Sequence, residues 1–192
     1  MVKKLKNKNL LEYSESYKKV LSYFFSFPEK PIGLNDLSKS INVSKTMVKK
    51  AVLNLVDKEV LKRDEIGKAW RIYANQKNAY FTTRKIAYNL QLVYEYNIIS
   101  EVYKKIPEAR AIILFGSYRW GTDNETSDID IAVEVLGNKP PRIDSLKTIK
   151  QMEYRKDVKV NLYIFSRAKT DINLFTNIAN GIVLDGLLEV KP

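Results

Sequence analysis

Residues 111–135 constrain the fold of this chain more than any other segment, because two strand-like runs stand on either side of a short polar loop. The segment reads AIILFGSYRWGTDNETSDIDIAVEV. Residues 111–115 form an uninterrupted apolar run of strand length, which predicts a buried strand. Residues 128–135 alternate acidic and apolar side chains, which predicts a second strand with one apolar face. Because positions i and i+2 of a strand point the same way, Asp128 and Asp130 are expected to share a face.

The junction after the first run carries Gly116 and Ser117, which are expected to open a short helix or turn. Free N–H groups at a helix start favour phosphate, glycine permits close approach of the backbone, and Ser117 adds a hydroxyl donor. Asp128 and Asp130 follow after ten intervening residues, and carboxylates are hard oxygen ligands that suit magnesium. The pattern therefore predicts a nucleoside triphosphate site at which a metal would assist in-line attack on the α-phosphate.

A Gly-Ser pair, ten residues and Asp-x-Asp together resemble the signature of the DNA polymerase β-like nucleotidyltransferases, in particular the minimal nucleotidyltransferase group. The resemblance covers residues 108–186, and like residues of that family also stand at Gly121, Ser127, Ile129, Ile131 and Val133. It implies that Gly116 and Ser117 bind the β- and γ-phosphates and that Asp128 and Asp130 are the catalytic, metal-binding carboxylates. It also implies Mg²⁺ or Mn²⁺ as cofactor and an NTP, expected to be ATP, as substrate.

One position departs from that family's pattern. The family usually places a third carboxylate on a later strand, and the matching position in VKVNLYIF, residues 158–165, is Asn161. An amide oxygen can bind a metal, but it carries no charge and cannot serve as a base. Asn161 is therefore predicted as the third metal-site residue, and turnover is left open. Asp157 is a second candidate for that position, although a salt bridge is its preferred interpretation.

Three other side chains near the motif allow more than one interpretation. Glu134 shares the face of Asp130 by parity and is expected to be a surface or supporting residue rather than a ligand. Arg119 could reach a phosphate and Trp120 could stack on a base, but both could equally pack locally.

The N-terminal part resembles a winged helix-turn-helix domain over about residues 34–73. Its apolar spacing and turn residues predict three helices followed by a two-stranded hairpin. The expected elements are a helix at 12–26 that ends before Pro28 and Pro31, a helix at 35–40 with Asn35 as N-cap, a helix at 45–57 with Ser44 as N-cap, and strands at 60–63 and 69–73 joined by a turn at 64–67.

The third of these helices has an apolar inner face and a basic outer face. The inner face comprises Val48, Ala51, Val52 and Leu55, and the outer face comprises Lys45, Thr46, Lys49, Lys50 and Asn54. A basic helix of this kind can enter a DNA major groove while a wing contacts the backbone. The wing candidates are Lys62, Arg63, Lys68 and Arg71, and the residues predicted to bind DNA are Lys45, Thr46, Lys49, Lys50, Arg63 and Lys68.

Charge is unevenly distributed along the chain. Residues 1–80 carry 17 Lys and Arg against 8 Asp and Glu, whereas residues 81–192 carry 16 against 14. Such a balance suggests that the N-terminal part meets a polyanion, and double-stranded DNA bound by a two-fold homodimer is expected. The alternatives are that the lysines only solubilise this part, or that the winged fold serves protein contacts.

The remaining segments complete an α+β fold with two domains, at residues 1–80 and 81–192. We expect one long linker helix at 81–105, a helix at 145–154, a strand at 158–165, and a helix at 171–180 with Gly181 as C-cap. The C-terminal domain is thus expected to be a nucleotidyltransferase fold with a small mixed sheet flanked by helices.

Composition limits the chemistry and the location. The chain has no Cys and no His, so disulfides, Cys/His zinc sites and histidine acid–base catalysis are excluded. The basic N-terminus lacks the apolar run of a signal peptide, and no apolar run is long enough to span a membrane. A cytoplasmic protein is expected.

Two functions remain open from the sequence. One is a metal-dependent transferase that moves a nucleoside monophosphate, expected to be AMP, from NTP to an unknown acceptor, with DNA bound by its N-terminal domain. The other is a DNA-binding transcriptional regulator whose nucleotidyltransferase domain is a weak or inert nucleotide sensor.

Overall fold

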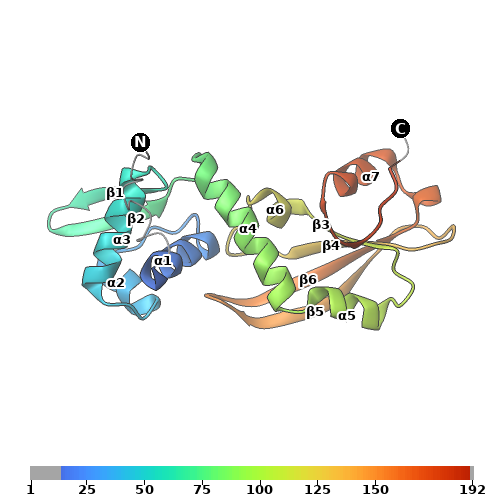
Figure 1. The fold of residues 1–192 in the computed structure, drawn as a ribbon, viewed down its shortest axis with the longest axis horizontal. Coiled ribbons are helices and arrows are strands. Elements are labelled where there is room, and N and C mark those ends of the chain that lie inside the picture. The colour runs from blue at the N-terminus through green and yellow to red at the C-terminus, as the bar shows by residue number, and fades with distance from the viewer. Residues whose placement is uncertain (1–13, 191–192) are drawn as a thin grey trace, which may run out of the picture. The chain divides into compact units, whose positions relative to one another are not determined.

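The computed structural model describes residues 14–190 of the chain (Figure 1). Contacts between residues divide the chain into two compact units, Met1–Phe81 and Thr82–Pro192. Residues 1–13 lie outside the described part. They include the segment expected not to be a signal peptide and the first two residues of the helix predicted at 12–26.

From residue 14 onward, the first unit contains three helices followed by a two-stranded antiparallel hairpin. The elements are α1 (Glu15–Ser26), α2 (Leu34–Ser40), α3 (Lys45–Asp57), β1 (Leu61–Ile66) and β2 (Ala69–Ala74). Ser44 is the N-cap of α3 and accepts a hydrogen bond from the Met47 amide, as predicted. The predicted inner face of α3 is also confirmed, because Val48, Ala51, Val52 and Leu55 are all fully buried.

Two local predictions in this unit are wrong. Gly33, not Asn35, is the N-cap of α2, and Asn35 lies inside the helix. The hairpin does not turn at 64–67, because β1 continues to Ile66, which pairs with Ala69. The turn is therefore Gly67-Lys68, and the positive φ of 61° at Gly67 suits a two-residue hairpin turn.

The second unit is built on a five-stranded mixed sheet in the order β5-β6-β4-β3-β7. Strands β4 and β6 are parallel, and the other neighbouring pairs are antiparallel. The strands are β3 (Ala111–Phe115), β4 (Ile129–Glu134), β5 (Arg142–Met152), β6 (Arg155–Phe165) and β7 (Ile182–Gly186).

Helices cover both faces of this sheet. One face packs its Ile, Leu and Val side chains against α4 (Ala79–Glu95) and α5 (Ile98–Lys105), and the other packs against α7 (Ile172–Ala179). On β4, Ile129 and Ile131 belong to the first core and Ala132 to the second. The alternation of β4 thus places Asp130 on the α7 side of the sheet. Burial of each branched side chain contributes about 1.5–3 kcal/mol, which holds β4 in this register.

The linker helix and the segment before β6 differ from prediction. The helix expected at 81–105 is two helices, because Asn97 adopts a left-handed conformation with φ 54° between α4 and α5. The segment expected to be a helix at 145–154 is strand β5, which pairs along its length with β6. Its apolar residues recur every third position at Ile143, Leu146, Ile149 and Met152, which favours a helix locally, but cross-strand pairing with β6 overrides that preference.

The C-terminal end shows two further differences. Strand β7 was not predicted, and it forms by antiparallel pairing with the buried strand β3. Asn180, not Gly181, is the C-cap of α7, while Asp171 is its N-cap. Within residues 14–190, none of the helices has the length and apolar character needed to cross a bilayer.

Candidate functional site

Strand register brings the two halves of the sequence motif together. Phe115 at the end of β3 pairs with Asp130 on β4, and Asp130 pairs with Asn161 on β6. Gly116 follows Phe115 directly and begins the short helix α6 (Gly116–Trp120), with half-buried Ser117 in its first turn. Gly116 and Ser117 after β3, Asp130 on β4 and Asn161 on β6 are therefore brought together across three adjacent strands of one sheet.

Gly116 lies against the Asp130 carboxylate. Its φ is +68°, and a Cβ atom added to it would lie 2.7 Å from Oδ2 of Asp130. An L side chain at this position would therefore meet both a strained backbone and a steric clash. Glycine is what allows the backbone of the Gly-Ser turn to approach the carboxylate.

Asn161 faces both carboxylates. Its Nδ2 donates to Oδ2 of Asp128 at 3.3 Å and to Oδ1 of Asp130 at 3.3 Å. The two oxygens thus converge on one point, and the amide rotated by half a turn would present its own oxygen there. The predicted alternative, Asp157, is exposed and pairs with Lys150 at 2.9 Å.

The site concentrates negative charge in a partly buried place. Burial raises the pKa of Asp130, the Asn161 hydrogen bond lowers it, and the Asp128 charge raises it again. Tyr163 lies two residues beyond Asn161 on β6, and burial together with Asp130 and Asp128 raises the pKa of its hydroxyl. A cation between the carboxylates would relieve this repulsion.

The donor set is of the type that magnesium takes, namely two carboxylate oxygens and one amide oxygen. Over residues 14–190 no cluster of three or more Asp, Glu, His or Cys side chains is arranged to hold a metal. Among the described residues, the charged side chains that could hold a metal at this point are Asp128 and Asp130, with Asn161 as a neutral ligand.

A comparison with protein families found a match in the second unit. Residues 97–185 match the model of the family Polymerase beta, Nucleotidyltransferase. The match runs from the start of α5 into β7 and includes the Gly-Ser turn, both carboxylates and Asn161. It supports a nucleotidyltransferase domain in the second unit and suggests nucleotidyl transfer as its general activity. A search of curated proteins found no match.

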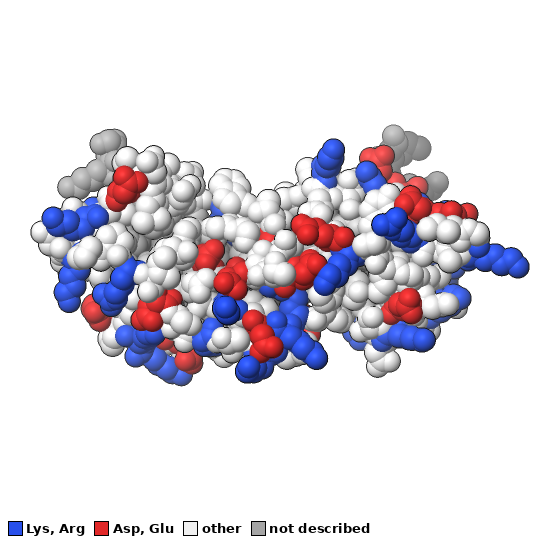
Figure 2. All heavy atoms as spheres, turned by 180° about the vertical axis from the view of Figure 1, so that it is seen from behind, with Lys and Arg blue, Asp and Glu red and all other residues white. Residues whose placement is uncertain are grey.

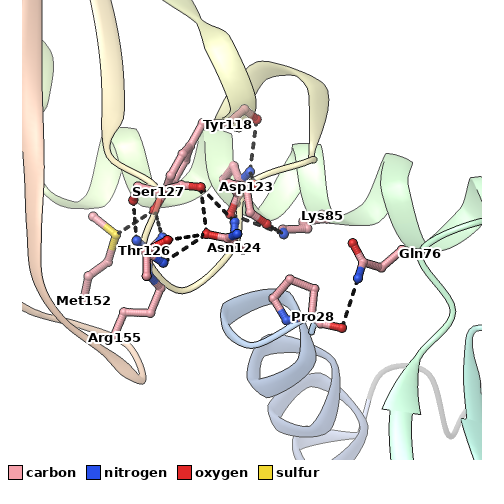
Figure 3. Close-up of polar contacts among 11 residues, drawn as sticks. Pro28, Gln76, Lys85, Tyr118, Asp123, Asn124, Thr126, Ser127, Met152 and Arg155 are labelled. Carbon is pink, nitrogen blue, oxygen red and sulfur yellow. Dashed lines mark hydrogen bonds and ion pairs between the residues drawn. The ribbon is translucent and has the colours of Figure 1, made fainter. Parts of the chain in front are cut away.

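The loop that joins the two halves of the nucleotidyltransferase motif is held by a buried ion pair (Figure 3). Lys85 of α4 is 1% exposed, and its Nζ lies 3.3 Å from Oδ2 of Asp123, which is 3% exposed. Lys85 also donates to the Asp123 carbonyl. Asn89, one turn further along α4, donates to Oδ1 of Asp123 at 2.6 Å and to the carbonyl of Tyr118 at 3.0 Å. Burial raises the pKa of Asp123, and the Lys85 charge opposes that rise.

Arg155 reaches the same loop from the start of β6. This side chain is 6% exposed, and it donates from Nη1 to the Tyr118 hydroxyl and from Nη2 to the Ser127 carbonyl. Tyr118 follows Ser117, and Ser127 precedes Asp128, so Arg155 bonds to the neighbours of both site residues. Arg155 thus links the Gly-Ser half of the motif to the Asp-x-Asp half through one side chain.

These supporting residues were not predicted from the sequence. Phe81, Lys85, Asn89 and Leu92 are all buried and recur at helical spacing on α4. That stripe is the signal which could have indicated that Lys85 and Asn89 face inward and need polar partners.

The structure shows the contacts of three side chains that the sequence left open. Arg119 donates to the Asn180 carbonyl at 2.6 Å and lies 3.6 Å from the centre of the half-exposed Trp120 ring, so both make local contacts. Glu134 is not a surface residue: it is 2% exposed and pairs with Arg167 at 2.8 Å.

In the first unit, the predicted DNA-binding side chains on α3 are all exposed: Lys45, Thr46, Lys49 and Lys50. Lys68 is exposed in the hairpin turn, while Arg63 is half-buried and pairs with Glu65 at 3.0 Å. On the face drawn in Figure 2, basic and acidic side chains are interspersed. Net charge alone therefore does not locate a binding surface.

Proposed function

We propose that this chain is a metal-dependent nucleotidyltransferase that moves a nucleoside monophosphate, with AMP the first to test, from an NTP to an acceptor. The observation that carries the proposal is the convergence of Asp128 and Asp130 beside Gly116, within a segment that matches the nucleotidyltransferase family. Gly116 and Ser117 would bind the β- and γ-phosphates through backbone N–H groups and the serine hydroxyl.

In the proposed reaction an acceptor oxygen bonds to the α-phosphorus, the bond to the β-phosphate oxygen breaks, and pyrophosphate leaves. Bound Mg²⁺ or Mn²⁺ would neutralise charge that develops on the phosphates. Asp128 and Asp130 would hold that metal, with Asn161 as a neutral ligand. The acceptor hydroxyl must also lose a proton, which would pass to water because the amide of Asn161 cannot take it.

A specific observation favours a second function. The third side chain at the metal position is an amide that bonds to both carboxylates, so the domain would bind nucleotide more readily than it turns it over. The chain would then be a DNA-binding transcriptional regulator with a nucleotide-sensing domain. In both proposals the N-terminal unit is a winged helix-turn-helix that binds duplex DNA as a homodimer, through Lys45, Thr46, Lys49, Lys50, Arg63 and Lys68.

One experiment separates the two functions. The full chain, its Asp128→Asn variant and its Asn161→Asp variant are incubated with α-labelled ATP, Mg²⁺ or Mn²⁺, and cell extract, and nucleotide binding is measured in parallel. Label transfer by the wild type that is lost in Asp128→Asn supports the enzyme, and a higher rate in Asn161→Asp supports the role given to Asn161. ATP binding without transfer by any variant refutes the enzyme and favours the sensor.

The DNA-binding part has its own test. Duplex binding should weaken steeply with salt, because lysine contacts to phosphate release counterions. The double variant Lys49→Glu, Lys50→Glu should bind more weakly than the wild type, and equal binding would contradict the proposal. Sedimentation of the free chain and of its complex tests the homodimer.

A further inference from the structure

The first unit has a pocket that the motif analysis did not reveal. It has a volume of about 320 Å³ and lies where the starts of α2 and α3 meet the hairpin turn. Three lysines line it, Lys45 and Lys49 from α3 and Lys68 from the turn, together with Trp70 of β2. Asp36 is the acidic residue in its lining, so cations outnumber it three to one.

Among residues 14–190, no salt bridge pairs the lysines of this pocket with a carboxylate. In the part of the chain that the structure describes, Lys45, Lys49 and Lys68 make no salt bridge, and all three are exposed. In the second unit, by contrast, the exposed Lys104, Lys105 and Lys150 each have an acidic partner, at 2.7, 3.1 and 2.9 Å. Three ammonium groups around one concave space attract an anion.

Trp70 orders part of this cationic lining. Lys49 Nζ lies 5.4 Å from the centre of its ring, and the Arg63 guanidinium lies 4.3 Å from it. Cation–π contacts of this kind hold long basic side chains in place. Arg63 is further tied to Glu65 at 3.0 Å. The half-buried indole therefore joins α3 to the hairpin and keeps Lys49 at the edge of the pocket.

We infer that this pocket binds one backbone phosphate of a nucleic-acid duplex. The inference rests on the DNA-binding part of the proposed function, and it places one phosphate contact in this pocket. A phosphodiester matches the charge of the three lysines, and Thr46 and Lys50 continue the exposed basic face of α3 beside the pocket. A phosphate held between α3 and the hairpin turn would fix the position of both elements on the duplex without reading its sequence.

The two tryptophans of the chain allow a direct test. Trp120→Phe leaves Trp70, which lines the pocket, as the single tryptophan. Its emission is followed while duplex DNA, inorganic phosphate or ATP is added, and duplex affinity is measured over a range of salt. The test pair is Lys49→Gln with Lys68→Gln. The matched control is Lys18→Gln with Lys39→Gln, which removes the same charge from exposed positions of the same unit outside the pocket.

Loss of one phosphate contact should reduce the slope of log K against log salt by about 0.9. We expect that reduction in the test pair, together with loss of the Trp70 response to duplex, and neither change in the control pair. The affinity loss should be similar for unrelated duplex sequences. Circular dichroism checks that each variant is folded, and Trp70→Phe alone should give a smaller loss of affinity.

The other outcomes each overturn the inference in a different way. Duplex binding with an unchanged slope in the test pair would leave DNA binding intact and remove the pocket from it. A Trp70 response to ATP or inorganic phosphate, with none to duplex, would assign the pocket to a free nucleotide or phosphate. No response to any of the three would refute the pocket as an anion site.

Discussion

The buried pair Lys85–Asp123 leads to the most demanding prediction. Both side chains are almost fully buried, at 1% and 3% exposed. In Lys85→Met the length of the side chain is kept and the charge is lost, so Asp123 remains buried with Asn89 as a side-chain partner. Breaking one partner out of a buried pair costs about 3–5 kcal/mol of unfolding free energy, and we expect a loss in that range at neutral pH.

The partner variants should not be symmetric. In Asp123→Asn the lysine keeps its bond to the Asp123 carbonyl, so we expect a smaller loss, of about 1–3 kcal/mol. In the double variant Lys85→Met, Asp123→Asn no buried charge remains unpaired, and stability should recover to within about 1–2 kcal/mol of the wild type. The double-mutant cycle should therefore give a coupling of about 4–5 kcal/mol, which is the sum of the two single losses less the loss of the double variant.

The pH dependence gives a second readout of the same pair. Burial raises the pKa of Asp123 in the folded wild type, and Lys85 opposes the rise. Without Lys85 the folded pKa rises further above its unfolded value. A carboxyl of this kind contributes stability below its unfolded pKa, and that contribution is lost as the pH rises through the folded pKa. The deficit of Lys85→Met should therefore shrink as the pH falls from neutral toward the unfolded pKa of the carboxyl group.

The assay is urea unfolding in a Trp70→Phe background, in which Trp120 beside the loop reports on the second unit. A loss of unfolding free energy below about 1 kcal/mol in Lys85→Met at neutral pH would refute the reasoning, because a buried carboxylate without a cationic partner destabilises the fold by more than that. A double variant no more stable than Lys85→Met would refute it as well.

Three other predictions concern the site and its frame. Gly116→Ala should lower the unfolding free energy by more than about 1–2 kcal/mol and abolish Mn·ATP binding in calorimetry, since its Cβ would lie 2.7 Å from Asp130 Oδ2. The control is Gly67→Ala, which has a similar φ and nothing within 4 Å and therefore shows the effect of backbone strain alone. Full ATP binding by Gly116→Ala would contradict the close approach of Gly116 to Asp130. Arg155→Met should weaken Mg·ATP binding about 10–100-fold, with a smaller loss in Arg155→Lys; unchanged affinity in a folded Arg155→Met would mean that Arg155 does not position the motif. Asn97→Ala should cost about 1–2 kcal/mol in urea unfolding and Asn97→Gly much less, because φ is 54° at that helix break; equal losses would exclude backbone strain as the cause.

Local pattern was sufficient where a segment's own residues decide its structure. The apolar run of β3 and the alternation of β4 are unambiguous, so both strands and the shared face of Asp128 and Asp130 could be predicted. The inner face of α3 and its Ser44 cap could be predicted for the same reason, because cap and apolar spacing agree.

Local pattern failed where a distant partner decides the structure. Residues 142–152 have apolar residues at a helix-compatible spacing, yet they form β5 because β6 offers a full ladder of backbone hydrogen bonds. Strand β7 exists only because the edge of β3 needs a partner. The continuous helix expected at 81–105 breaks at Asn97, and the apolar periodicity of the segment gives no indication of a break at that residue.

The candidate site divides in the same way. The sequence by itself predicted which residues would carry the proposed chemistry, because Gly116, Ser117, Asp128 and Asp130 are recognisable by type and spacing. Only the tertiary structure decided that Asn161 meets both carboxylates, since that depends on the parallel register of β4 and β6. It alone revealed Lys85, Asn89 and Arg155 as the frame of the motif and Trp70 as the link between α3 and the hairpin. Contacts between residues far apart in the chain depend on how side chains pack together, and that packing cannot be predicted from each residue's type alone.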